Sequence, residues 1–301
     1  MKKLKLKKPK IILYLGGGAM SGIFSAGVLT KLLELDAYPR IEAIYAGSSG
    51  AINGAYFLTK QQFSSVYYEE LTHDFILPPR VFVGLMQLLW NRYIRVLPDE
   101  KARNVVNINF AFDIFRNKKP LDIGKLKEQR IPFYAKLLNV ATGEIVYMDV
   151  RNNGDPLRCL KAAACVKPYY FSTQMIDGKE YIDGTIKEPI GLTYLLERHP
   201  HCEIVVIINE PIRREFRHTV KVFLEGVSAS LYPYPVHLFS YFMKRERLLK
   251  DDIKIAMNNP RVLLVSPPSN NPTVPRTVDP SKLKITYQMG LKEAEKIRNF
   301  L

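Results

Sequence analysis

A serine flanked by small residues lies between a short apolar run and an apolar helical pattern. Residues 41–46 predict a β-strand, and the segment that follows the serine predicts a helix that begins at once. On such a sharp turn the serine hydroxyl points away from the backbone, and the first N–H groups of the helix lie close to where an oxyanion would form. The pattern is typical of a nucleophile elbow and predicts a serine hydrolase.

Two serines of this turn compete for the role of nucleophile. Ser48 has Gly50 two positions after it but Ala46 two positions before it. Ser49 has Gly47 two positions before it but Ala51 two positions after it. We assign Ser48, because a glycine at the second position lets the helix pack hard against the strand. For this segment taken alone, a plain strand–helix connection and a phosphate-binding loop stay open as alternatives.

Three consecutive glycines follow the first apolar run of the chain. The run at 11–15 predicts a strand, and apolar residues between Ile23 and Leu35 recur at helical spacing. Glycines let backbone N–H groups point into a site with no Cβ in the way, which suits an anion or an oxyanion. The loop expected to hold the oxyanion consists of Gly16, Gly17, Gly18 and Ala19.

Two nucleotide-binding motifs fit this glycine loop less well. A dinucleotide fingerprint needs its third glycine one place before Gly22, and the next strand ends in the serine turn instead of an acidic residue for the ribose. A P-loop needs a lysine followed by serine or threonine, and no such pair follows the glycines. The oxyanion loop is therefore preferred, and a nucleotide-binding α/β protein is the less favoured alternative.

Aspartate precedes glycine at two places downstream. Asp177-Gly178 lies between two short strand-like runs and predicts a hairpin turn. Asp183-Gly184 closes the second of these runs, so its carboxylate is expected to face a crevice at the edge of a parallel sheet. Taken alone, Asp183 is better explained as a turn residue.

In this order the motifs resemble those of the patatin-like phospholipase family. The glycine loop resembles the family's oxyanion loop, Ser48 its elbow serine and Asp183-Gly184 its Asp-Gly motif. Residues 162–168 are similar to the small-residue helix and proline that precede the family's aspartate hairpin, and residues 279–294 are similar to its last helix. The resemblance implies a three-layer α/β fold with a mostly parallel central sheet and helices on both faces.

The resemblance also implies the chemistry, a Ser–Asp dyad that cleaves a carboxylic ester of a phospholipid or another acyl ester. Asp183 would accept the Ser48 proton while N–H groups of the glycine loop hold the oxyanion, and a water activated by Asp183 would release the acyl group. No cofactor and no metal is expected. None of the five histidines has the setting of a catalytic base, which fits a dyad: His73, His199, His201, His218 and His237.

Three positions depart from the family's pattern. Ser21 stands where the family usually has arginine or lysine, Ala46 replaces the first elbow glycine, and Thr185 replaces the second glycine after the aspartate. The missing charge is expected to weaken oxyanion stabilisation or loop ordering. These departures keep open a second interpretation, a catalytically weak relative that binds lipid or acyl groups on the same scaffold.

The composition fits one α/β domain, residues 10–301, behind a basic tail, residues 1–9. The chain is 47% hydrophobic, enough for a large core, and has no low-complexity linker. Strand-like runs alternate with helical patterns, which favours a mostly parallel sheet; the runs are 11–15, 41–46, 133–140, 144–149, 174–182, 203–208 and 261–265. Without a signal peptide before the first run, we expect a cytoplasmic protein with three free, buried cysteines.

The net charge of +15 favours an anionic partner. No nucleic-acid-binding motif accompanies the basic residues, so an anionic membrane surface contacted by the lysines of residues 2–10 is the expected partner. A solvated basic face explains the charge equally well. Two uncharged stretches, 81–90 and 226–243, are too short or too broken to cross a bilayer. We expect core or lid helices there, with membrane docking as the alternative. In the functional interpretation one of these stretches lines an acyl channel. The sequence does not indicate the oligomeric state.

Overall fold

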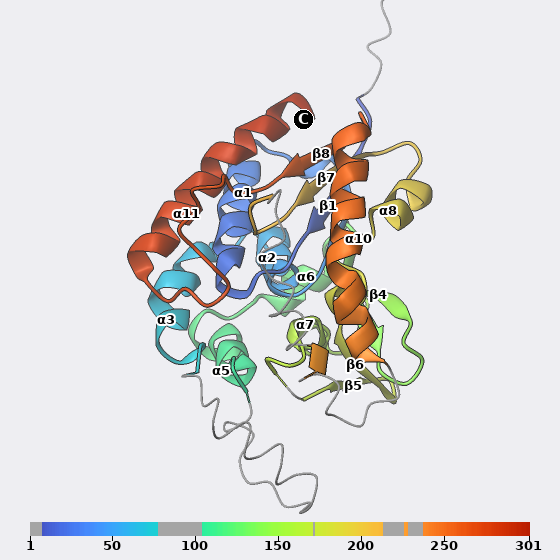
Figure 1. The fold of residues 1–301 in the computed structure, drawn as a ribbon. Coiled ribbons are helices and arrows are strands. Elements are labelled where there is room, and N and C mark those ends of the chain that lie inside the picture. The colour runs from blue at the N-terminus through green and yellow to red at the C-terminus, as the bar shows by residue number, and fades with distance from the viewer. Residues whose placement is uncertain (1–7, 78–103, 171, 213–225, 228–236) are drawn as a thin grey trace, which may run out of the picture.

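The computed structural model of the 301-residue chain describes residues 8–77, 104–170, 172–212, 226–227 and 237–301. Within them, eight strands form a central sheet in the order β5-β6-β3-β2-β1-β7-β8, with β4 paired to β3 outside this path (Figure 1). The strands are β1 (Ile11–Leu15), β2 (Ile41–Ala46), β3 (Phe133–Asn139), β4 (Ile145–Asp149), β5 (Gln174–Ile176), β6 (Lys179–Asp183), β7 (Glu203–Ile207) and β8 (Val262–Val265).

The sheet is parallel at its centre and antiparallel at one end. β1 pairs in parallel with β2 and β7, β2 pairs in parallel with β3, and β7 pairs in parallel with β8. β3 is antiparallel to both β4 and β6, and β5 is antiparallel to β6. The sheet is therefore mostly parallel with helices around it, which confirms the fold class predicted from the sequence.

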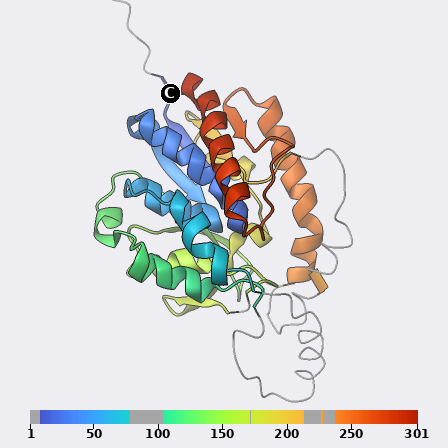
Figure 2. The ribbon, with the colours of Figure 1, turned by 90° about the vertical axis from the view of Figure 1, so that its left-hand side faces the viewer.

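Side chains of β1 alternate between two cores, one on each face of the sheet. Ile11, Leu13 and Leu15 join the larger core, whereas Ile12 and Tyr14 join the smaller one. A strand buried on both faces must be apolar throughout, as this run is. The larger core lies under α1 (Ile23–Glu34), α2 (Ser49–Leu58), α7 (Pro156–Ala164) and α11 (Pro280–Glu293), and the smaller one under α8 (Leu192–Arg198) and the second half of α10 (Leu238–Asn258) (Figures 1 and 2).

Shorter elements complete the described part of the chain. The short α-helices are α3 (Leu71–Asp74), α5 (Ile108–Asp113) and α6 (Ile123–Lys127). The 3₁₀ turns are η1 (Ala19–Gly22), η2 (Tyr38–Arg40), η6 (Gly184–Ile186) and η7 (Ala294–Asn299). Two π-helical turns extend neighbouring helices, η3 (Val66–Glu70) before α3 and η5 (Ile114–Lys118) after α5.

Helices α1 and α11 cross at two glycines. A Cβ on Gly27 would overlap the Tyr287 carbonyl oxygen, and a Cβ on Gly290 would overlap a carbonyl oxygen of α1. The two backbones therefore approach each other where only glycine fits. The segment before α11 also reaches the glycine loop, because the Met20 N–H donates to the Pro275 carbonyl at 3.2 Å.

Strand β3 has three partners, and their registers place Asp183 beside the serine turn. β4 pairs with residues 134–138 and so takes one edge of β3, which leaves the other edge to β2 at residues 133–135 and β6 at residues 137–139. Ala46 lies opposite Ala135, and Asp183 lies opposite Leu137, two residues further along the same edge. Asp183 therefore continues the line of β2 just where that strand turns into α2.

The predicted elements can now be compared with the observed ones. Each predicted strand-like run contains a strand, and the run at 174–182 divides into β5 and β6 at the predicted Asp177-Gly178 turn. The three cysteines are free, but only Cys159 and Cys165 are buried; Cys202 is half-buried, so the prediction that all three are buried is wrong there.

Several predicted features fall on other parts of the chain. Residues 1–7, the apolar stretch 81–90 and His218 lie outside the described residues, as do residues 228–236 of the stretch 226–243, whose last residues begin α10. Among the residues that are described, no helix has the length and apolar character needed to cross a membrane.

Candidate active site

Ser48 lies on the turn between β2 and α2 in a backbone conformation that side chains rarely adopt. Its φ is 52° and its ψ is −135°. Such a conformation costs ~1–3 kcal/mol and persists only where the surroundings impose it. Here the neighbours are glycines: a Cβ on Gly50 would overlap the Leu15 carbonyl oxygen, and a Cβ on Gly47 would overlap the Thr185 methyl group. Close packing on both sides therefore fixes the serine turn.

The glycine loop after β1 touches Ser48. A Cβ on Gly17 would lie 2.5 Å from the Ser48 Cβ and 3.1 Å from its Oγ. The Gly16 N–H donates to a β7 carbonyl at 2.8 Å, so it is not free to bind an oxyanion. Between described residues, no hydrogen bond uses the N–H groups of Gly17, Gly18 or Ala19. Those three donors remain for an anion beside Ser48.

Asp183 is fully buried at the end of β6. Its Oδ1 accepts a hydrogen bond from the Thr185 N–H at 2.8 Å, and its Oδ2 accepts none from the described residues. Burial raises the pKa of Asp183 from 3.8 to about 6, while Thr185, the Arg245 charge and the Ser48 hydroxyl act in the opposite direction. A carboxylate with this pKa is a stronger base than an exposed aspartate and is still ionised at neutral pH.

The second serine of the turn has different neighbours. Ser49 begins α2, and its buried hydroxyl lies against the phenol of Tyr67 and against Gly22 at the start of α1. Ser48 is therefore the serine of the turn that lies beside both the glycine loop and Asp183.

Asn209 is a residue of this region that the sequence did not single out. It lies two residues beyond β7, and its Nδ2 donates to the carbonyls of Gly16 at 2.7 Å and Gly17 at 3.1 Å. Its Oδ1 accepts the Ser25 N–H at 3.0 Å. A polar residue at the carboxyl end of a strand predicted to be parallel was the available signal, since ligands bind at that edge.

A cation reaches the site from α10 and not from the glycine loop. The Arg245 Nε donates to the Thr185 carbonyl at 3.3 Å, and the Arg245 charge lowers the pKa of Asp183. Ser21, the loop residue that stands where the family usually has a basic one, is 1% exposed. Its hydroxyl makes no hydrogen bond to any described residue. Sequence reasoning missed Arg245 because 60 residues separate it from Thr185.

A buried lysine supports the segment that follows Asp183. Lys136 of β3 donates to the carbonyls of Glu188 at 3.1 Å and Ile190 at 2.6 Å, and pairs with the Glu188 carboxylate at 3.0 Å. Burial lowers the pKa of Lys136, and Glu188 opposes that effect. These contacts tie residues 184–190 to the strand whose next residue, Leu137, pairs with Asp183.

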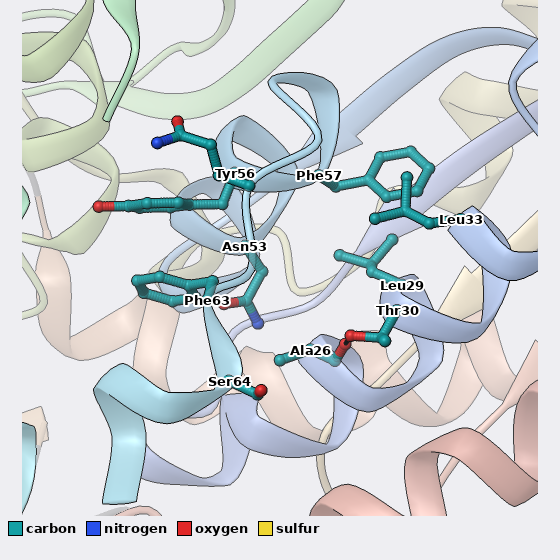
Figure 3. A pocket seen from close by; sticks show the side chains of 10 residues that line it. Ala26, Leu29, Thr30, Leu33, Asn53, Tyr56, Phe57, Phe63 and Ser64 are labelled. Atoms are coloured by element: carbon teal, nitrogen blue, oxygen red, sulfur yellow. Dashed lines mark hydrogen bonds between the residues drawn. The ribbon is translucent and has the colours of Figure 1, made fainter. Parts of the chain in front are cut away.

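Two hollows in the described part lie away from Ser48 and Asp183. The first, of about 20 Å³, lies between α1 and α2 beside Asn53 (Figure 3). It has room for a water molecule and not for an acyl chain. The second, of about 780 Å³, lies between β4, α8 and α10. Within the described ranges, histidine, cysteine and acidic side chains form no group of three or more that could hold a metal ion.

Comparisons with solved structures show what the fold is similar to. VipD from Legionella pneumophila aligns with 97% of this chain and 67% of its own, at a TM-score of 0.52 and 11% identity. ExoU, in its complex with SpcU from Pseudomonas aeruginosa, aligns with 98% of this chain at a TM-score of 0.38 and 11% identity. This chain spans 54% of the ExoU chain. At 11% identity the likeness to VipD concerns the fold alone.

Sequence comparison gives the family. No curated protein matches the chain. The sequence model of the family Patatin-like phospholipase matches residues 13–196, a span that begins in β1, contains the glycine loop, the serine turn and Asp183, and ends in α8. Because this match covers more than half of the sequence, the chain belongs to the patatin-like phospholipase family.

Proposed function

We propose that this protein hydrolyses carboxylic esters of phospholipids or other acyl esters, with Ser48 as nucleophile and Asp183 as base. The observation that carries the proposal is the meeting of three parts at one edge of the sheet. These are a constrained serine, a glycine loop with unused N–H groups, and a buried aspartate whose pKa is raised to about 6. The family to which the chain belongs supports a lipid substrate.

In the first half of the reaction, the Asp183 carboxylate takes the proton of the Ser48 hydroxyl as Oγ attacks the ester carbonyl. The tetrahedral oxyanion is held by N–H groups of Gly17, Gly18 and Ala19. Its collapse breaks the ester bond, and the proton on Asp183 passes to the leaving alcohol. The acyl group is then bonded to Ser48.

In the second half, Asp183 takes a proton from a water molecule that attacks the acyl-enzyme. The same loop holds the second oxyanion, the acyl–Oγ bond breaks, and the proton returns to Ser48. One base therefore serves both steps, and its carboxylate must be ionised at the start of each. We expect the rate to rise with pH through about 6, the value to which burial raises the pKa of Asp183.

A fluorophosphonate that forms a covalent adduct with activated serines tests this assignment. We expect the adduct on Ser48, mapped by mass spectrometry of the digested protein, and we expect Asp183→Asn to abolish both the adduct and ester hydrolysis. Ser48→Ala should likewise lose the adduct and ester hydrolysis. Its matched control, Ser49→Ala, should keep the adduct on Ser48 and the hydrolysis. An adduct on Ser49 would overturn the choice of nucleophile.

The second candidate function is lipid or acyl binding on the same scaffold with weak or no catalysis. The observation that favours it is Ser21, which leaves the glycine loop without its own cation. No adduct on either serine, together with retained binding of a fluorescent phospholipid, would establish this alternative. The least favoured alternative, nucleotide binding by the glycine loop, would show as nucleotide-dependent thermal stabilisation.

We place this activity in the cytoplasm, with peripheral contact to an anionic membrane surface. The lysines of residues 2–10 and the net charge of +15 support contact with anionic lipid. Such contact would hold the protein at the surface in which its substrate lies.

A further inference from the structure

The carbonyls of Gly16 and Gly17 both accept hydrogen bonds from one buried side chain, the amide of Asn209. We infer that Asn209 is the positioning residue of the oxyanion loop: by holding these two carbonyls on one side, it turns the N–H groups of Gly17 and Gly18 toward Ser48. The inference rests on the proposed function and adds a part that neither the serine turn nor the Asp-Gly motif supplies.

The geometry follows from the planarity of the peptide bond. In a trans peptide the C=O and the N–H of the next residue lie in one plane and point in opposite directions. The carbonyl of Gly16 shares a peptide with the N–H of Gly17, and the carbonyl of Gly17 shares one with the N–H of Gly18. Since Asn209 holds both carbonyls, both N–H groups must point away from Asn209. These N–H groups make no hydrogen bond to other described residues, and Ser48 lies against Gly17.

A clamp is needed because glycine peptides rotate easily. Glycine adopts positive φ about as readily as negative φ, so a loop of three glycines has no intrinsic preference that would keep its N–H groups on one side. A single flipped peptide would replace a donor by a carbonyl oxygen, which repels an oxyanion. The two bonds from Asn209 favour one orientation of both peptides.

Asn209 also fixes the loop to helix α1. Its Oδ1 accepts the N–H of Ser25, one of the first-turn donors that has no partner within the helix. Gly22 precedes the helix and has no side chain that could cap it, so the cap comes from Asn209 in a distant segment. The side chain is 1% exposed, and its Cβ approaches Gly18 so closely that a Cβ there would lie only 2.9 Å away.

Among side chains of similar size, only this amide can make the hydrogen bonds observed here. It donates two hydrogen bonds from Nδ2 and accepts one at Oδ1, and all three are made to backbone groups. Aspartate would keep the bond from Ser25 but would place an acceptor against two carbonyls. Asn209→Asp is therefore the variant that removes the clamp while keeping the shape of the side chain.

The matched control is Asn53→Asp. Asn53 is 2% exposed and belongs to the same buried network, where its Nδ2 donates to the Gly22 carbonyl and to the Ser25 hydroxyl. It holds neither of the two loop carbonyls that Asn209 holds. Both variants lose two donated bonds in the interior, so both should be destabilised to a similar degree, measured as the urea midpoint of unfolding.

The two variants should differ in the reaction. For a p-nitrophenyl ester we expect Asn209→Asp to lower kcat by ~10²–10³-fold with KM within about threefold, because the loss falls on the transition state. The rate of Ser48 labelling by the fluorophosphonate should fall in parallel. For Asn53→Asp we expect kcat within about threefold of the wild type. Equal kcat losses in the two variants, or an unchanged kcat in Asn209→Asp, would overturn the inference.

A structural readout keeps the inference testable if the wild type labels neither serine, an outcome that would reject only the proposed function. Crystal structures of Asn209→Ala and Asn53→Ala avoid a buried charge and report the loop directly. We expect at least one of the 16–17 and 17–18 peptides to be rotated in Asn209→Ala and neither to be rotated in Asn53→Ala. An unrotated loop in Asn209→Ala would reject Asn209 as a positioning residue whether or not the protein hydrolyses esters.

Discussion

Asp183 lies where its negative charge lowers the stability of the fold. The carboxylate is fully buried, and burial raises its pKa to about 6, whereas in the unfolded chain it would titrate near 3.8. Between these values folding favours the protonated acid, and above them the folded protein must hold a charge that it disfavours. The group that we propose as the base therefore lowers the stability of the fold at the pH where it would work.

Replacing Asp183 by asparagine should therefore stabilise the protein at alkaline pH while abolishing hydrolysis. The raised pKa corresponds to about 3 kcal/mol of lost stability above pH 6, and this loss disappears as pH falls toward the unfolded value. We expect the urea midpoint of Asp183→Asn to exceed that of the wild type at pH 8, and the difference to shrink at pH 4.5. A difference that is equal at the two pH values would contradict a raised pKa.

Arg245 tunes the same group from α10. Its charge lowers the pKa of Asp183, so Arg245→Gln should raise that pKa further and move the acid limb of the pH–rate profile to higher pH. The measurement is kcat/KM for a neutral ester between pH 5 and pH 9, with Arg247→Gln on the same helix as control. If both variants shift the limb equally, the effect comes from the general charge of the helix and not from Arg245.

The sequence identified those site residues that belong to a short motif, and it missed those that reach the site only through tertiary contacts. The glycine loop, Ser48 and Asp183 each belong to a short pattern, and the structure brings all three to one edge of the sheet. Their catalytic roles stay proposals. Asn209 and Arg245 belong to no pattern, because each contacts its target across a large separation in sequence. Only the pairing of β1 with β7 and the packing of α10 place them near the site.

Among the elements, the crossing of α1 and α11 leaves no room for a side chain. Gly290→Ala would place a methyl group against a carbonyl oxygen of α1, and Gly27→Ala would do the same against α11. We expect each substitution to lower the free energy of unfolding by ~1–3 kcal/mol, because the helices must separate or distort. Chemical denaturation measures the loss.

The control for this crossing is Gly154→Ala. A Cβ on Gly154 would meet no atom within 4 Å, so the substitution should change stability by less than about 0.5 kcal/mol. If Gly154→Ala and Gly290→Ala cost the same, the loss would come from the general effect of replacing glycine and not from the helix contact.

Element prediction succeeded where the pattern is local. Apolar runs predicted the strands, and the turn signal at Asp177-Gly178 predicted the hairpin of β5 and β6. The three partners of β3 could not be predicted, because strand pairing at its two edges depends on registers between segments far apart in sequence. Lys136 illustrates the limit: a lysine in an apolar run looks like a surface residue, yet here it is buried and paired with Glu188.

For the molecule as a whole, the net charge of +15 leads to a prediction about surfaces. We expect binding to vesicles that contain anionic phospholipid, and we expect it to weaken as salt rises, because salt screens exposed charges. Deleting residues 2–10 removes six lysines, each worth ~1 kcal/mol near an anionic surface, and should reduce binding strongly. Cosedimentation measures both effects, with vesicles of neutral phosphatidylcholine as control. Unchanged binding after the deletion would exclude the tail as the contact.

The contacts that join the glycine loop and α1 to the segment 275–290 also have a consequence during synthesis. The loop emerges from the ribosome early, but the Pro275 carbonyl that accepts the Met20 N–H, and the helix that packs on Gly27, are made more than 250 residues later. A nascent chain therefore carries the serine turn long before its glycine loop has full support. If the protein attacks membranes, it would become competent to do so only after residues 275–290 have been made.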